Sequence, residues 1–326
     1  MSVLVTGGAG YIGSHVVRLL KLRGDDVVVL DDLSTGHADR IGDVPLVRLD
    51  LSSHDSVDVL HRAIVQHRVD AVIHVAARKQ VGQSMERPTF YMRQNVGGMI
   101  NLLDAMETSG VRRFVFSSSA ATYGAPDMAE IDELTECVPI NTYGETKLIG
   151  ERMCDRSAAA WGLAAASLRY FNVAGAGWPD LGDPAAFNLI PIVFDRLVSG
   201  ARPQVFGDDY PTPDGSCIRD YVHVLDLAEA HVLALDRLDA PEHRVLNIGT
   251  GRGSSVFDVL DVIGRATGLD TTPDVVERRP GDPARLVGNV DRAAAELGWR
   301  AVRELPEIVA SAWMAHPGRR VRQSTG

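Results

Sequence analysis

The sequence lacks long hydrophobic runs and an excess of positive charge. No apolar run approaches the length that spans a bilayer, and no basic segment precedes the first apolar residues, so we expect a soluble, intracellular protein with no membrane partner. The formal net charge is -10 over 326 residues. Such a chain has no general attraction to nucleic acid, and an anionic ligand would need cations placed locally.

Cysteine is also scarce. The three cysteines, Cys137, Cys154 and Cys217, are odd in number and far apart in the sequence. This pattern favours reduced, buried thiols in a cytosolic protein over a disulfide framework or a metal site. The hydrophobic content is 45%, which at this length predicts a large core, and we expect two lobes rather than one.

The first residues of the sequence, in contrast, are rich in glycine. Residues 3–5 form a short apolar run typical of a buried strand, and Gly7, Gly10 and Gly13 follow it. The next apolar residues have helical spacing, and a second apolar run ends at Asp31. Glycines alone would also suit a tight turn without a ligand. The whole pattern predicts a dinucleotide site, with the pyrophosphate on the helix N-terminus and the acid on a ribose hydroxyl.

The acid at position 31 bears on which dinucleotide binds. A carboxylate that faces the ribose 2′ position accepts from a hydroxyl but repels a 2′-phosphate. No Arg or Lys follows Asp31 in residues 32–37 to neutralise such a phosphate. The sequence therefore favours NAD over NADP.

Strand and helix patterns go on alternating after Asp31. We expect strands at residues 44–49, 70–75 and 111–116, and helices at residues 57–65 and 85–109. This alternation predicts an α/β fold with a Rossmann-type, doubly wound parallel sheet.

Polar residues follow several of these strands. Asp50 follows the third strand, where an adenine contact and a simple helix-start acid both suit the sequence. Arg78 and Lys79 follow the fourth strand, where they would meet phosphate or solvent. Asn95 falls inside the predicted helix 85–109, where it either faces solvent or bonds to another group.

The fifth strand ends in three serines, Ser117 to Ser119, at the sheet edge where ligands of such folds bind. Downstream, Tyr143 and Lys147 are four residues apart near the start of a predicted helix and therefore share one helix face. An ammonium beside a phenol favours the phenolate. We therefore expect Lys147 to lower the pKa of Tyr143 and prepare it as a general base.

The second half of the sequence is less regular. Helical spacing occurs at residues 188–197, 222–238 and 256–266, with short strands near residues 205 and 245–247. Arg219 and Arg279 suit either a diphosphate or surface salt bridges. We predict a dinucleotide-binding domain over residues 1–172, a smaller α/β substrate lobe over residues 173–316 with some segments returning to the first sheet, and a tail over residues 317–326.

The glycine spacing, Ser119 and the Tyr143/Lys147 pair resemble the extended short-chain dehydrogenase/reductase family. Four stretches are similar to its UDP-glucose (UDP-galactose) 4-epimerases: VTGGAGYIGSH at residues 5–15, FSSSAATYG at 116–124, LRYFNVAG at 168–175 and FGDDYPTPDGSCIRDYVHVLD at 206–226. The last stretch is long and unusual, so it is the most specific. The similarity extends to about Trp313.

This resemblance implies an NAD-dependent isomerase of nucleotide sugars that oxidises C4 of the sugar, lets the 4-keto intermediate turn and reduces its opposite face. Tyr143 would be the general base, Lys147 would hold the nicotinamide ribose, and Ser119 would orient the reacting oxygen. The resemblance further implies a cytoplasmic homodimer whose surface is formed by helices within residues 85–109 and 143–162.

The resemblance also assigns binding residues. The implied coenzyme contacts are Gly7, Gly10, Tyr11, Ile12, Gly13, Asp31, Asp50, Leu51, Lys79, Asn95, Tyr143, Lys147 and Tyr170. The implied UDP-sugar contacts are Ser119, Tyr143, Asn172, Asn188, Val205, Phe206, Arg219, Arg279 and Asp282, with Val205 and Phe206 at the uracil ring.

Two positions depart from the pattern of these relatives. Ala121 stands where many have Thr, so that one sugar contact is missing or is replaced by Thr122. Leu286 stands where the family limits the width of the pocket, which leaves N-acetylated sugars open.

Four alternatives to a glucose/galactose 4-epimerase remain, and one of them, a net redox enzyme that uses NADP, is disfavoured by Asp31. Another UDP-sugar could be the substrate. A 4,6-dehydratase needs a carboxylate just after the serine strand, and Ala120 to Tyr123 supply none. A non-catalytic binding protein would have no use for Ser119, Tyr143 and Lys147 together.

Overall fold

A computed structural model describes residues 1–185, 187–279 and 281–319 of the chain. The chain divides into two compact units, each made of separate segments. Unit 1 comprises Met1–Gly124, Glu136–Arg169 and Ala228–Leu246. Unit 2 comprises Ala125–Thr135, Tyr170–Leu227 and the described residues from Asn247 onwards. In the described ranges, no helix combines the length and the apolar character that crossing a membrane requires.

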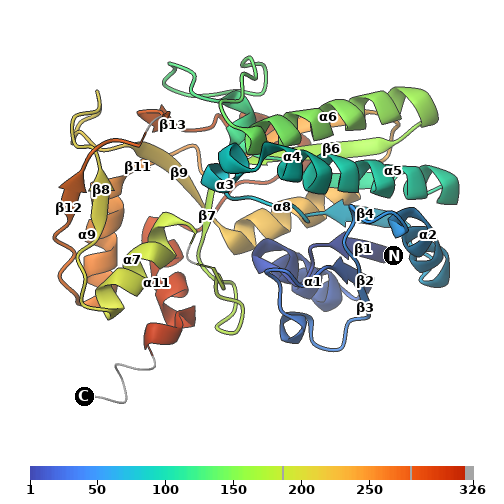
Figure 1. Cartoon of the computed structure of the whole chain (residues 1–326), viewed down its shortest axis with the longest axis horizontal. Helices are drawn as coiled ribbons and strands as arrows, with labels where there is room; N and C mark the ends of the chain where they lie inside the picture. Colours follow the sequence, from blue (N-terminus) through green and yellow to red (C-terminus); the bar gives the residue numbers. More distant parts are fainter. Residues whose placement is uncertain (186, 280, 320–326) are drawn as a thin grey trace. The chain divides into compact units, whose positions relative to one another are not determined.

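Unit 1 is built on a seven-stranded sheet in the order β10-β6-β5-β4-β1-β2-β3 (Figure 1). The strands are β1 (Ser2–Thr6), β2 (Asp26–Asp31), β3 (Leu46–Arg48), β4 (Ala71–His74), β5 (Arg113–Ser117), β6 (Ala164–Tyr170) and β10 (His243–Ile248). The pairings from β3 across to β6 are parallel. The strand order reverses beside β1, as in doubly wound sheets, which confirms the predicted fold class.

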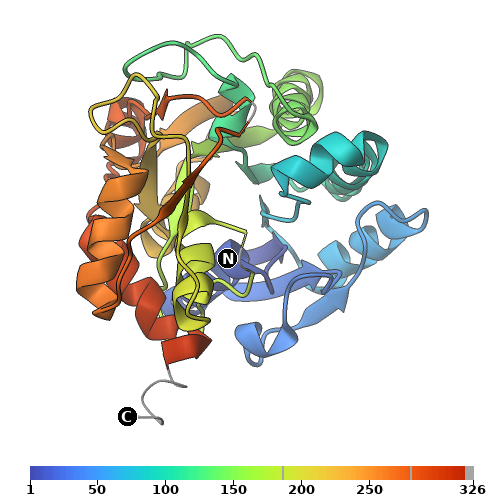
Figure 2. The same ribbon diagram turned by 60° about the vertical axis from the view of Figure 1, so that its left-hand side comes forward.

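Helices cover both faces of this sheet. Helices α2 (Ser56–Gln66), α5 (Gly98–Ser109) and α6 (Thr142–Trp161) bury one face in a core that includes Leu4, Leu60 and Met106. Figures 1 and 2 show α5 and α6 side by side. Helix α1 (Tyr11–Arg23) is joined to α8 (Val224–Asp236) by an ion pair of 2.7 Å between Arg23 and Asp236.

The helix predicted over residues 85–109 is interrupted once, at Arg87. The region contains α3 (Val81–Glu86) before this residue, and α4 (Pro88–Tyr91), the π-helix η2 (Met92–Gly97) and α5, which follow one another without a gap. The physical reason for the interruption is Pro88, because a proline disfavours helical geometry in the residue before it, and Arg87 has φ -130° and ψ 55°. The wide turn of η2 lies next to the end of β4, which matters for Asn95 below.

Unit 2 contains shorter strands around a smaller core. Strand β9 (Ile218–His223) pairs with β7 (Asn172–Ala174), β11 (Gly253–Ser255) and β13 (Arg285–Leu286), while β8 (Gln204–Phe206) pairs with β12 (Asp274–Val276). The helices are α7 (Leu189–Val198), α9 (Val256–Thr267), α10 (Asp291–Leu297) and α11 (Leu305–Ala315). Phe194, Ile263 and Ile308 belong to the core that α7, α9 and α11 share.

The unit boundaries differ from the predicted break at residue 172. Residues 125–135 belong to unit 2 because Ile131 bridges to Gly288 and accepts a hydrogen bond from Asn247. Most of α8 and β10 belongs to unit 1. The helix expected from residue 222 begins at Val224, because the two residues before it complete β9. Of the predicted tail, residues 320–326 lie outside the described residues.

Candidate active site

The glycine turn after β1 has the geometry that the spacing predicts. Gly7 has φ +70°, and a Cβ atom there would lie 2.6 Å from the backbone nitrogen of Ala76. A Cβ atom on Gly13 would lie 2.0 Å from the Gly7 oxygen, so the turn and α1 pack too closely for any side chain. Within α1, which is fully described, no acidic residue occupies the first turn, and no side chain caps Gly10. The amide groups of this helix start can therefore bind an anion.

Asp31 ends β2 beside this turn. Its carboxylate accepts from the backbone nitrogen of Ala9 at 3.0 Å and from that of Leu33 at 2.9 Å. The side chain is buried, and burial raises the pKa of Asp31 while these two backbone hydrogen bonds oppose the rise. The acid is thus held in one orientation between the glycine turn and the loop after β2, as a ribose contact requires.

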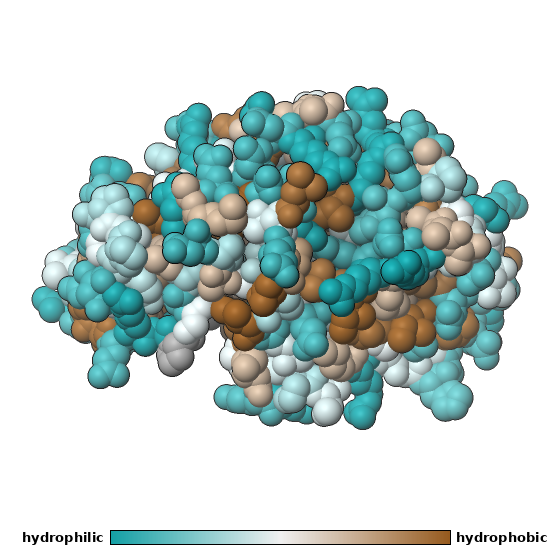
Figure 3. All heavy atoms as spheres, turned by 90° about the horizontal axis from the view of Figure 1, so that it is seen from above, coloured by the Kyte–Doolittle hydropathy of each residue, from teal (hydrophilic) through white to brown (hydrophobic). Residues whose placement is uncertain are grey.

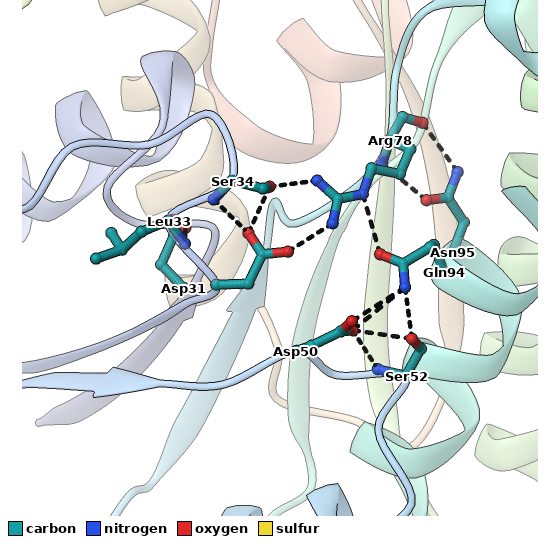
Figure 4. A network of polar contacts seen from close by, with 9 residues as sticks. Asp31, Leu33, Ser34, Asp50, Ser52, Arg78, Gln94 and Asn95 are labelled. Carbon is teal, nitrogen blue, oxygen red and sulfur yellow. Dashed lines mark hydrogen bonds and ion pairs between the residues drawn. The ribbon is translucent and has the colours of Figure 1, made fainter. Parts of the chain in front are cut away.

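A polar network joins the loops that follow β2, β3 and β4 (Figure 4). Arg78 forms an ion pair of 2.6 Å with Asp32, hydrogen bonds to Ser34 and donates to Gln94 at 3.0 Å. Gln94 in turn donates to Asp50 at 3.2 Å. In the ligand-free structure the Arg78 guanidinium therefore has a carboxylate partner, and its side chain is 22% exposed.

The other residues assigned to this edge have different surroundings. Asn95 is buried and bonds to the protein: its Oδ1 accepts from the Arg78 backbone nitrogen, and its Nδ2 donates to the Arg78 carbonyl and to Thr146 on α6. Leu51 is buried in the core of unit 1, while Lys79 is exposed. Tyr11 is buried and Ile12 half-buried in the first turn of α1.

Tyr143, Lys147 and Ser119 lie together in unit 1. Asn141 caps α6 by accepting from the Gly144 nitrogen at 2.8 Å, which fixes the start of the helix that carries Tyr143. The Tyr143 side chain is buried and hydrogen bonds to Ser119. Lys147 donates to the Ser117 carbonyl at 2.7 Å, and its nitrogen lies 5.8 Å from the centre of the Tyr143 ring.

The three serines at the end of β5, Ser117 to Ser119, each have a different partner. The Ser117 hydroxyl lies 2.6 Å from Nε2 of His231, and the Ser118 hydroxyl donates to Glu151 at 2.5 Å. The Ser119 oxygen accepts from the Ala121 nitrogen at 3.1 Å as well as contacting Tyr143. Only Ser119 is therefore placed beside Tyr143, and the other two anchor the end of the strand.

The expected lowering of the Tyr143 pKa is wrong for the ligand-free protein. Burial raises the pKa of Tyr143 to about 12, although the hydrogen bond from Ser119 acts in the opposite direction. The same burial lowers the pKa of Lys147 to about 7, and the nearby charge of Glu151 only partly offsets this. Because water is excluded from both groups, the neutral forms of the phenol and the amine are favoured.

Sequence reasoning missed a buried ion pair behind Lys147. Arg169 at the end of β6 donates to both oxygens of Glu151, at 2.6 and 2.9 Å, and its guanidinium lies 4.7 Å from the centre of the Tyr123 ring. Glu151 lies four residues after Lys147 on α6. Tyr143, Lys147 and Glu151 are thus spaced four residues apart and lie on one face of α6. Three polar residues on one helix face indicate a buried polar network, and this spacing could have predicted it from the sequence.

Unit 2 brings together most of the residues assigned to a UDP-sugar. Arg219 on β9 is only 12% exposed and pairs with Asp282 at 3.6 Å. The Arg279 guanidinium lies 3.8 Å from the centre of the Phe206 ring, which is close enough for a cation–π contact. Val205, which precedes Phe206 on β8, is buried in the core of the unit.

Three further assigned residues lie elsewhere in unit 2. Asn172 on β7 hydrogen bonds to Tyr221 on the neighbouring β9. Asn188 precedes α7 and donates to Asp183 at 2.9 Å. Tyr170, the last residue of β6, is half-buried.

The two departures from the family pattern are now placed. Thr122, which follows Ala121, is completely buried, and its hydroxyl donates to the Ser119 carbonyl at 2.8 Å. Leu286 lies on β13, opposite Arg219 of β9.

Comparison with known proteins agrees with this geometry. Residues 3–249 match the NAD dependent epimerase/dehydratase family. The chain belongs to that family. It is 44% identical over 319 residues to a UDP-glucose 4-epimerase of Corynebacterium glutamicum, covering 96% of this chain and 95% of the relative.

Solved structures of this family have the same fold. A UDP-glucose 4-epimerase from Brucella ovis in complex with NAD matches with a TM-score of 0.90 and 44% identity, over 95% of this chain and 97% of the other. A UDP-glucose 4-epimerase from Stenotrophomonas maltophila with bound NAD and formylated UDP-arabinopyranose matches with a TM-score of 0.92 and 39% identity, over the whole of both chains.

NAD is the coenzyme of this epimerase/dehydratase family member, and the residues of unit 1 fit it. The start of α1 is open to the pyrophosphate, and side-chain-free positions at Gly7 and Gly13 allow the close approach of backbone that the dinucleotide requires. Asp31 is held as an acceptor at the end of β2. Coenzyme roles for Asp50, Lys79 and Asn95 are part of the proposal that follows.

Proposed function

We propose that this protein interconverts UDP-glucose and UDP-galactose, with the residue roles that the sequence predicts. The observation that carries the proposal is the hydrogen-bonded pair of Tyr143 and Ser119, with Lys147 on the same helix face, in the unit that has the NAD turn. The near-full-length similarity to UDP-glucose 4-epimerases supports the choice of substrate.

NAD, when bound, supplies the two-electron acceptor and donor for an epimerisation without net oxidation, together with a positively charged ring beside the sugar. Tyr143 accepts the proton of the sugar 4-hydroxyl as C4 is oxidised, and returns it after the opposite face of the 4-keto sugar is reduced. Ser119 hydrogen bonds to the same oxygen and keeps it in line with the phenol. Protons and electrons balance over the cycle, since each is removed once and returned once.

The high pKa of Tyr143 shapes this role. A phenol with a pKa of about 12 is protonated at neutral pH, so proton abstraction needs positive charge close to it. Lys147 supplies such a charge when protonated, and a pKa of about 7 allows it to gain or lose a proton near neutrality. Glu151 favours the protonated form of Lys147.

The residues of unit 2 have a different task. Arg219 and Arg279 match the diphosphate of a UDP-sugar, and the Phe206 ring suits the uracil. Binding energy from this non-reacting part of the substrate retains the ketone while it turns. Asn172, Asn188 and Asp282 are proposed as further polar contacts, with Val205 supporting the uracil side and Tyr170 on the coenzyme and sugar side.

A substrate panel tests this function. UDP-glucose, UDP-galactose, their N-acetylated forms, and UDP-linked pentose and uronate are each incubated with the protein, and the C4 configuration is followed by NMR. Turnover of the glucose/galactose pair is expected. Turnover confined to an N-acetylated, pentose or uronate pair would replace the substrate, and release of water would indicate a dehydratase, for which Ala120 to Tyr123 of η3 offer no carboxylate.

We further propose a cytoplasmic homodimer. The supporting features are the scattered free cysteines and the adjacent helices α5 and α6, with Ile100 of α5 45% exposed. Figure 3 shows the molecule from above, after a turn of 90° from the view of Figure 1, and on this face hydrophobic residues reach the surface in groups among polar ones. Sedimentation velocity should give twice the chain mass, and Ile100→Asp should shift it towards the monomer. A wild-type protein that sediments as a monomer would contradict the dimer.

A further inference from the structure

Asp31 lies near the cation of Arg78, which is distant from it in the sequence. The Arg78 guanidinium reaches the loop after β2, where it pairs with Asp32 at 2.6 Å and hydrogen bonds to Ser34. Burial raises the pKa of Asp31, and the charge of Arg78 partly offsets this, so the guanidinium also acts on that carboxylate. The absence of Arg and Lys from residues 32–37 therefore does not by itself explain why the protein uses NAD.

The position of Arg78 follows from the strand order. Arg78 comes after β4 and Asp32 after β2, while β1 and its glycine turn lie between these two strands. The side chain of Arg78 must therefore pass over the carboxyl end of β1 to reach Asp32. Figure 4 shows Arg78 beside Ser34 of the loop after β2. In a doubly wound sheet this is the edge where the adenosine half of a dinucleotide binds, and Asp31 marks its ribose.

The charges at this edge decide which dinucleotide can bind there. Three carboxylates, those of Asp31, Asp32 and Asp50, surround one guanidinium, since Arg78 pairs with the second and acts electrostatically on the other two. A 2′-phosphate adds further negative charge to this excess. A guanidinium without a carboxylate partner, in contrast, is the side chain that binds phosphate best.

We propose that Asp32 is a specificity-determining residue, which excludes NADP by occupying Arg78, a guanidinium that would otherwise bind the 2′-phosphate. Asp31 repels the phosphate directly, and Asp32 removes the cation that could compensate. The ion pair of Arg78 and Asp32 can persist in solution because the two side chains are only 22% and 26% exposed. Water and salt therefore weaken this ion pair less than they weaken a fully exposed one.

The test measures which dinucleotide the purified protein retains. Each variant is incubated with an equal excess of NAD and NADP and desalted, and the nucleotide released by heat is separated and quantified. The variants are Asp31→Asn alone, Asp31→Asn with Asp32→Ser, and the latter pair with Arg78→Met. Asn at position 31 keeps an acceptor for Ala9 or Leu33, and Ser at position 32 keeps the local turn, so the fold should survive, as thermal melting will verify.

The expected results follow from the freed guanidinium. Asp31→Asn alone should raise the NADP to NAD ratio slightly, and adding Asp32→Ser should raise it about 10-fold or more, the value of one charge-assisted hydrogen bond. Adding Arg78→Met should cancel this gain. Arg93→Met, an exposed arginine of η2, should leave it intact as the matched control. A gain that survives Arg78→Met, or no gain from Asp32→Ser in a protein that still melts cooperatively, would overturn the proposal.

Discussion

The two units of the molecule differ in how the chain assembles them. In unit 1 the coenzyme turn, Asp31, Arg78 and Ser119 lie at or just after the carboxyl ends of parallel strands of one sheet, so the regular alternation of strands and helices brings them to one edge. In unit 2 the cluster of Arg219, Arg279 and Phe206 comes from short strands and loops, and its contacts join residues far apart in the sequence. Under the proposed function, the first arrangement carries the reacting groups at the sheet edge and on α6, and the second carries the diphosphate and uracil contacts on short strands and loops.

This difference predicts two kinds of mutant. Groups on the rigid edge should affect the chemical step, because they act on the reacting atoms. Groups in the loop-built unit should affect substrate affinity, because they contact the part of the substrate that does not react. The predictions below test that division.

The largest effect is expected from removing the Tyr143 hydroxyl. Tyr143→Phe should lower kcat roughly 100- to 10,000-fold, since it deletes one acid-base group, while KM for the UDP-sugar stays nearly constant. Steady-state kinetics with UDP-galactose measure both constants. Tyr91→Phe is the control, because Tyr91 is also a buried tyrosine of unit 1, but its hydroxyl bonds to Gln83.

A Tyr143→Phe variant with kcat close to that of the wild-type protein would contradict the acid-base assignment. A variant with unchanged kcat but a much higher KM would break the division between the units, because a group on the rigid edge would then serve affinity.

The second prediction concerns the contribution of Lys147 to the pH dependence of stability. Its pKa of about 7 in the folded protein lies below its ordinary value of 10.5. Between these pH values the unfolded chain binds a proton that the folded chain does not, so the free energy of unfolding should rise with pH by roughly 1.4 kcal/mol per unit. Below pH 7 both states are protonated, and this contribution should be constant.

Urea unfolding at pH 7 and pH 9.5 measures this rise in the wild-type protein and in Lys147→Met. The variant should lack the part of the rise that comes from Lys147, while other titrating groups contribute equally to both proteins. Equal slopes in the two proteins would show that Lys147 is charged when folded, and that the charged pair with Glu151 outweighs its burial.

The regular unit is also the one whose elements the sequence predicts. The second apolar run, which ends at Asp31, forms β2 (Asp26–Asp31), and the glycine turn has the geometry that its spacing requires. Strand β6 escaped prediction because AAASLRY has few of the β-branched residues that mark strands. In unit 2, β9 was not predicted, because it lies in the stretch at residues 206–226 that was interpreted only through its resemblance to the family. The helix expected at residues 256–266 is present as Val256–Thr267.

The site could be predicted only where its residues are close in sequence. Tyr143 and Lys147 share a helix turn, so their proximity follows from spacing. The pairing of Arg78 with Asp32 depends on strand order and could not be read locally. The predicted direction of the Tyr143 pKa shift was also wrong, because burial of the phenol dominates the shift and burial has no local sequence pattern.

The smallest of the three effects is expected in unit 2, where a substitution should change substrate affinity rather than the chemical step. Arg219→Met should raise KM for UDP-galactose roughly 10- to 100-fold and leave kcat nearly unchanged, since a charged hydrogen bond to phosphate contributes about 1.5 to 3 kcal/mol. The fold should tolerate the change, because the freed carboxylate of Asp282 is 39% exposed and water can solvate it.

Arg202→Met is the matched control for Arg219→Met. Arg202 also pairs with an aspartate of unit 2, Asp274 at 3.4 Å, but both side chains are at least half exposed. Its removal should therefore leave kcat and KM unchanged. A fall in kcat for Arg219→Met at saturating substrate would mean that the diphosphate contacts also act in the transition state. Remote binding energy would then contribute to the chemical step, and the division between the two units would be one of position rather than of function.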